Sequence, residues 1–66
     1  MKIIAKKGDL LFVIEEDLPD IGAYLYVYNP QNKCIADYLQ DDVNSCKKQA
    51  FDMYGISYED WYFYVE

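Results

Sequence analysis

The stretch AYLYVYNPQNKCIADYL, residues 23–39, decides the fold because it predicts two strands joined by a tight turn. Residues 23–28 alternate small or aliphatic side chains with tyrosine, which is the two-residue period of a strand. In the turn, Pro30 presets the first central position of a type I turn, and Asn32 can adopt the left-handed backbone conformation that closes a hairpin. A second strand over residues 33–39 completes the predicted antiparallel hairpin.

Two registers of this hairpin are compatible with the residues. If Asn29 pairs with Lys33, Leu25 faces Asp37, and this carboxylate lies among aliphatic side chains. If Tyr28 pairs with Lys33 instead, Asp37 joins the tyrosines on the other face. A buried carboxylate without a partner is costly, which favours the second register. That register, however, places Asn29 in a helical conformation before proline, which is disfavoured.

The segments before the hairpin predict two further strands. Residues 1–5 form a short first strand, and residues 7–9 a turn around glycine. Residues 10–15 are an apolar run too short for a helix, so they predict a strand that is central or covered on both faces. Residues 16–22, which contain Pro19, are expected to form a loop.

A helix is expected to follow the hairpin. Asp41 or Asp42 can cap its first turn, and Gly55 can end it in the left-handed cap position with Ile56 in apolar contact. Between these ends, apolar side chains recur at steps of three and four residues and form one stripe: Val43, Cys46, Ala50, Met53 and Tyr54. This pattern predicts one amphipathic helix packed on the sheet.

The C-terminal segment predicts a single helical turn and one more strand. Ser57 and Asp60 have the spacing of a capping box. Residues 61–65 are dense in aromatic side chains and are expected either to add an edge strand to the chain's own sheet or to pair with another chain. The expected fold is a single α+β domain over residues 1–66, in which a three- or four-stranded antiparallel meander carries one helix on one face.

Composition limits the functions to consider. The chain has 66 residues, of which 53% are apolar, and a net charge of −6, with six lysines and no arginine. Nucleic acids and anionic membranes attract basic surfaces, so the charge argues against both and favours a basic protein partner. The longest uncharged apolar run, residues 10–14, is too short to cross a bilayer, and residues 1–6 lack a signal-peptide core. We therefore expect a cytoplasmic protein.

Most catalytic and metal chemistry is unexpected in this chain. Without histidine there is no Ser–His or Cys–His nucleophile, and Cys34 and Cys46 alone cannot complete a zinc site. The two cysteines are expected to be small buried hydrophobic residues, with a disulfide or a redox role as the alternatives. The acidic clusters lack the spacing of a calcium loop, and the isolated glycines form no phosphate loop. We expect no enzymatic activity and no cofactor.

The tyrosines are the candidate contact residues. Tyr24, Tyr26, Tyr28 and, in one arrangement, Tyr38 lie on one sheet face, where they can form a protein-binding platform. Alternatively, a second copy of the chain or residues 61–65 cover this face, or the rings are simply half-exposed. Without neighbouring positive charge, stacking of RNA bases is not expected. The aromatic tail adds two more candidates, Trp61 and Phe63.

The order of these motifs carries two resemblances. The pattern YLYVY, IADYLQD, Ala50, Tyr54-Gly55-Ile56 and Trp61 resembles a set of small uncharacterised bacterial proteins with a hairpin, an Asp-started helix and a Gly-Ile stop. More distantly, the strand–strand–Asp–helix order is similar to the partial fold of HicB-type antitoxins, which implies a dimeric, toxin-neutralising domain. The helix opening departs from that family, whose Thr-Leu-Glu-Glu-Ala is replaced here by DVNSC.

These observations predict a non-catalytic protein-binding module, inhibitory or antitoxin-like, that engages a basic partner. The first alternative is a structural homodimer in which aromatic surfaces bury each other. The second is a nucleic-acid mimic in which carboxylates stand in for phosphates; it requires one surface to carry Glu15, Glu16, Asp17, Asp20, Asp41, Asp42, Glu59 and Asp60.

Overall fold

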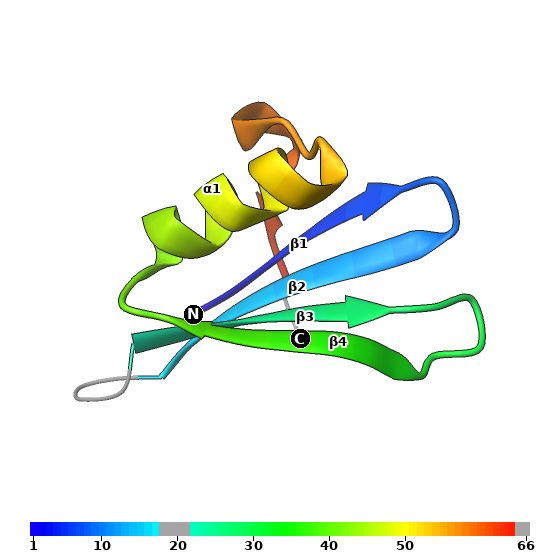
Figure 1. Cartoon of the computed structure of the whole chain (residues 1–66), viewed down its shortest axis with the longest axis horizontal. Helices are drawn as coiled ribbons and strands as arrows, with labels where there is room; N and C mark the ends of the chain where they lie inside the picture. Colours follow the sequence, from blue (N-terminus) through cyan, green and yellow to red (C-terminus); the bar gives the residue numbers. More distant parts are fainter. Residues whose placement is uncertain (18–21, 65–66) are drawn as a thin grey trace.

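In the described part of the chain, a five-stranded antiparallel sheet carries one helix across one face (Figure 1). The computed structural model describes residues 1–17 and 22–64. The spatial order of the strands is β4-β3-β2-β1-β5. The elements, in chain order, are β1 (Lys2–Lys7), β2 (Leu10–Asp17), β3 (Gly22–Tyr28), β4 (Cys34–Gln40), α1 (Val43–Tyr54), a 3-10 turn (Tyr58–Asp60) and β5 (Tyr62–Phe63). This confirms the predicted α+β meander with one helix and an extra C-terminal strand, and β2 is the central strand, as expected.

A β-bulge in β4 combines features of both predicted hairpin registers. At the turn, the Asn29 N–H donates to the Lys33 carbonyl oxygen at 2.9 Å, as in the first register. Tyr28 then pairs with Cys34 and Val27 with Ala36, so that Ile35 has no partner of its own in β3. From there on Tyr26 faces Asp37, so this carboxylate joins the tyrosines as in the second register. The extra residue thus keeps the carboxylate out of the core while the turn keeps its favoured geometry.

Local hydrogen bonds explain why the turn residues suit this hairpin. The Asn29 side-chain oxygen accepts hydrogen bonds from the backbone N–H groups of Gln31 and Lys33, both at 3.0 Å. Asn32 has a φ of 63°, which confirms the predicted left-handed conformation.

The core lies between the sheet and α1. Paired strand positions form two rows on this face, Ile3–Ile14–Leu25–Tyr38 and Ala5–Phe12–Val27–Ala36. From the helix, Cys46 and Ala50 are fully buried against these rows, and Ile56 is buried just beyond the helix end. The small side chains of Cys46 and Ala50 let the helix approach the sheet closely. The ring centres of Phe12 and Tyr54 lie 5.0 Å apart.

The helix ends follow the sequence prediction. The Ser45 N–H donates to the Asp42 carboxylate at 2.7 Å, which makes Asp42 the N-cap. Gly55 has a φ of 74° and its N–H donates to the Phe51 carbonyl at 3.0 Å. Met53 is a correction, because its side chain is 55% exposed. It lies about 80° around the helix from the first stripe residue and so falls at the margin of the packed face.

The predicted loop over residues 16–22 begins too early. β2 continues through Glu16 and Asp17, which pair with Ala23 and Gly22. Pro19 lies outside the described residues. Gly22 is required where it is, because its φ is 110° and a Cβ there would collide with the carbonyl oxygen of Gln40. The other end of the chain behaves as expected, since the Ser57 N–H donates to the Asp60 carboxylate at 3.3 Å and a 3-10 turn forms.

Candidate protein-binding face

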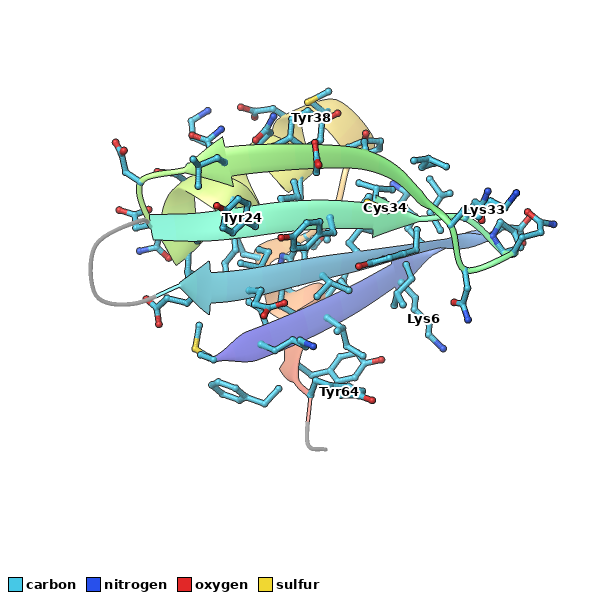
Figure 2. The ribbon with its side chains drawn as sticks, turned by 90° about the horizontal axis from the view of Figure 1, so that it is seen from below. Lys6, Tyr24, Lys33, Cys34, Tyr38 and Tyr64 are labelled. Carbon is cyan, nitrogen blue, oxygen red and sulfur yellow. The ribbon has the colours of Figure 1, made fainter. Side chains whose placement is uncertain are left out.

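The sheet face opposite the helix is open to solvent over much of its area. Figure 2 views the molecule from this side, with Tyr24 on the near face of the sheet and the helix behind it. We refer to this surface, formed by the alternate residues of the strands that point away from α1, as the open face.

The strand registers arrange the open face in three rows across the sheet. The first row is Tyr62–Ile4–Val13–Tyr26–Asp37, the second Lys2–Glu15–Tyr24–Leu39 and the third Lys6–Leu11–Tyr28–Cys34. Tyr64 extends the second row, because its N–H donates to the Lys2 carbonyl at 3.0 Å and the Lys2 ammonium lies 5.6 Å from its ring centre. Aliphatic side chains therefore fill the middle of the face and aromatic rings lie on both sides of them.

Three tyrosines of β3 form a continuous aromatic row. Tyr24 and Tyr26 are stacked with ring centres 5.7 Å apart and planes at 15°, and Tyr26 and Tyr28 lie 6.4 Å apart at 42°. All three side chains are half-buried, and Tyr26 has a neighbouring ring on both sides. Contact between neighbouring rings orders them before any partner binds, which lowers the entropy lost in an interface.

The strands around this tyrosine row contain carboxylates but no lysine. β2, β3 and β4 contain no lysine, while Glu15 and Asp37 both lie on their open side. Burial and then the nearby charge of Glu15 raise the pKa of Tyr26 above its ordinary value of 10.0, with smaller contributions that include Asp37. The Tyr26 hydroxyl is therefore a neutral hydrogen-bond donor at physiological pH, and the local charge is negative.

The lysines of this face lie to one side, on β1. Lys2 contacts Glu15 at 3.9 Å, while Lys6 occupies the far end of the third row. Between the tyrosine row and Tyr64, an open groove of about 390 Å³ crosses β1 and β2; its lining includes Lys2, Ile4, Leu11, Val13, Tyr28 and Tyr64. The open face thus has an acidic, aromatic half over β2–β4 and a groove that leads toward the lysines.

The structure separates the six candidate contact residues. Tyr24, Tyr26 and Tyr28 share the open face as predicted. Tyr38 does not join them, because the bulge at Ile35 turns it toward the helix, where its hydroxyl lies 3.1 Å from that of Tyr54.

The two candidates from the aromatic tail also lie away from the tyrosine row. Trp61 is half-buried against the core. Phe63 pairs with Ile3 of β1, so it projects on the helix side of the sheet, where it is 69% exposed. The expected edge strand is confirmed for Tyr62–Phe63, while Val65 lies outside the described residues.

Several open-face residues were not among the six candidate contact residues. Asp37, Leu39 and Glu15 flank the tyrosines, and Leu11 and Val13 floor the face beside them. Leu11 and Val13 occupy alternate positions of β2 and so share one face. The sequence does not show which face this is, because an unbroken apolar run does not tell which side of a strand is the core.

The two free cysteines differ in accessibility. Cys46 is buried, and burial raises the pKa of its thiol to about 11, so it stays protonated. Cys34 is exposed at the start of β4, which corrects the expectation that both cysteines are buried. Within residues 1–17 and 22–64, no group of three His, Cys, Asp or Glu side chains could hold a metal ion. In the same part of the chain, no helix has the length and apolarity needed to span a membrane.

Comparisons of this chain with protein-family models, with curated proteins and with solved structures found no match.

Proposed function

We propose that this chain is a non-catalytic protein-binding module whose open face contacts a basic partner. The observation that carries the proposal is the row of three ordered tyrosines on a sheet face not covered by the helix. Glu15 and Asp37 lie beside this row, and β2, β3 and β4 contain no lysine. Tyrosine is enriched at protein interfaces because it contributes a large contact area with few rotatable bonds.

The chemistry of this half of the face suits lysine or arginine side chains. A cation can lie over the ring of Tyr24 or Tyr26 and also approach the carboxylate of Glu15 or Asp37. A cation–π contact contributes about 0.5–1 kcal/mol at exposed sites and more where water is excluded. The overall charge of −6 adds long-range attraction, which mainly accelerates association and weakens as salt is added.

The positions of the carboxylates favour this proposal over a nucleic-acid mimic. Glu15 lies on the open face, whereas Asp42 caps the helix and Asp60 lies in the 3-10 turn, both on the helix side of the sheet (Figure 1). Carboxylates divided between opposite sides of the molecule do not provide a single phosphate-like track.

The test is a quantitative capture experiment with extract from the native host. Immobilised wild-type chain is compared with the open-face variant Tyr24→Ser/Tyr26→Ser and with a helix-face control, Phe51→Ser/Met53→Ser, whose two residues are also half-exposed. Circular dichroism first establishes that all three proteins are folded at the assay temperature.

The proposal predicts a basic protein that is enriched by the wild type and by the helix-face control but not by the open-face variant. The purified partner must then bind the wild-type chain in a direct calorimetric titration, with an affinity that falls as salt is raised. Equal binding by the open-face variant, or loss of binding in the helix-face control alone, would show that the contact surface lies elsewhere.

A further inference from the structure

β4 is an exposed edge of the sheet. It is the last strand in the spatial order, and no described residue pairs with its outer side. Its open-face side chains include Ile35, Asp37 and Leu39, and the two aliphatic ones are 54% and 55% exposed. An unpaired strand with accessible apolar side chains is a template on which another strand can add.

The two edges of the sheet differ in how they are protected. At the opposite edge, the short β5 pairs with β1 at Ile3 and Ile4, and β1 ends in two lysines. Lysine and proline are common devices that protect edge strands, and β4 contains neither. The bulge at Ile35 and the charge of Asp37 are the features of β4 that restrict which strand can pair with it.

Asp37 disfavours a second copy of this chain at the edge. If two copies of β4 paired antiparallel along their full length, the middle residue of Cys34–Gln40 would face itself, which sets Asp37 opposite Asp37. Like charges directly opposite each other destabilise a strand pair. A shift of two residues, which keeps the open faces of both copies on the same side, places Asp37 against Ile35 or Leu39 and leaves the carboxylate without a counter-charge.

We propose that β4 binds an extended segment of a basic protein by strand addition, with a lysine or arginine opposite Asp37 and apolar residues opposite Ile35 and Leu39. This inference rests on the proposed function and specifies the form of the partner. Asp37 forms no ion pair within the described part of the chain, so it is available to a cation from outside.

The first row of the open face brings Tyr26 within reach of a side chain that binds Asp37. Asp37 pairs directly with Tyr26, which in turn pairs with Val13. Directly opposite side chains in neighbouring strands have Cβ atoms roughly 4.5–5.5 Å apart. A long cationic side chain beside Asp37 therefore lies within reach of both the carboxylate and the ring of Tyr26. Strand addition at β4 and contact with the open face use the same partner segment.

The test uses a defined probe, the blocked peptide Thr-Val-Thr-Arg-Thr-Val-Thr, titrated to millimolar concentration into ¹⁵N-labelled full-length protein. Its Val, Arg and Val alternate with the spacing of Ile35, Asp37 and Leu39. Strand addition predicts amide shifts concentrated in β4 and slower solvent exchange of those β4 N–H groups that point outward. The matched control peptide has the same sequence with N-methyl groups on the backbone edge that would pair, and it should not bind.

A charge swap tests the role of Asp37. In the Asp37→Lys variant, the preference should pass from the arginine peptide to the peptide with glutamate at the same position. Each matched pair should bind about two- to fivefold more tightly than its mismatched pair, the range expected for a cross-strand ion pair. Asp37→Lys changes an exposed side chain, so the variant is expected to stay folded.

The remaining outcomes overturn the inference in distinguishable ways. Shifts confined to Tyr24, Tyr26 and Tyr28, with equal binding of the N-methylated peptide, would leave the open face as a contact surface and remove strand addition. Concentration-dependent β4 shifts without peptide would show that a second copy occupies the edge. The absence of any β4 shift at millimolar peptide would also contradict strand addition, whereas the capture experiment decides the proposed function independently.

Discussion

Deletion of Ile35 should leave the fold and both faces of the sheet unchanged. Tyr28 pairs with Cys34 and Val27 with Ala36, so removal of the residue between them gives a regular ladder. Downstream, every side chain stays on its present face. Any other outcome would mean that the bulge is needed for a reason other than the placement of β4 side chains.

The expected loss of stability is small because of where Ile35 lies. Its side chain is 54% exposed, so deletion forfeits less than half of the roughly 1.5–3 kcal/mol that full burial of an isoleucine contributes, or about 1 kcal/mol. The total stability of a 66-residue domain is roughly 3–10 kcal/mol, so the variant should remain folded. A strand forced onto the wrong face would bury Asp37 unpaired and expose Tyr38, at a cost of several kcal/mol.

Urea denaturation and NMR together measure this prediction. The free energy of unfolding should fall by about 1 kcal/mol or less, with an unchanged dependence on urea. Cross-strand nuclear Overhauser effects between Tyr26 and Asp37 should persist. Unfolding of the variant, or a new contact between Tyr26 and Tyr38, would refute the explanation of the bulge.

Three further predictions follow from individual side chains. The hydrogen bond from a backbone N–H lowers the pKa of Asp42 below 3.8. The Asp42 carboxylate therefore contributes to stability above pH 3.8, and this contribution is lost as pH falls through the lower pKa of the folded state. In Asp42→Asn, the urea concentration at the unfolding midpoint should fall less between about pH 6 and about pH 2 than in the wild type. Tyr54→Phe should destabilise the fold by about 1 kcal/mol at neutral pH, because it leaves the half-buried Tyr38 hydroxyl without its partner. The same hydrogen bond raises the pKa of Tyr54 above 10.0. The difference in unfolding free energy between wild type and Tyr54→Phe should therefore be constant below pH 10 and shrink as pH rises through the raised pKa. Urea denaturation at about pH 8 and at alkaline pH measures this difference in both ranges. At pH 8 a thiol reagent should label Cys34 rapidly and Cys46 only in urea, because burial raises the pKa of Cys46 to about 11; rapid double labelling of the native protein would contradict its placement in the core.

Much of the fold was predictable from short sequence patterns. The turn around Asn32, the cap at Asp42 and the stop at Gly55 are each set by a few neighbouring residues, and the structure confirms all three. The prediction that Met53 packs on the sheet was wrong. Helical spacing gives the centre of an apolar stripe but not the width of the surface against which the stripe packs.

The candidate site was only partly predictable because one residue decides the faces of β4. Two-residue alternation correctly placed Tyr24, Tyr26 and Tyr28 together. The bulge at Ile35 shifts all later residues of its strand by one step and so separates Tyr38 from this row. No composition rule specifies where such a residue is inserted; here the demands of the turn and of Asp37 meet at that point.

The central claim is that the open face is available to a protein other than a second copy of this chain. Sedimentation equilibrium of the wild-type protein across the micromolar range tests it most directly. We expect a monomer with the chain mass of 7.8 kDa at every concentration. A stable dimer that dissociates when Tyr24 and Tyr26 are replaced by serine would contradict it, since the tyrosine row would then be buried by the chain's own copy.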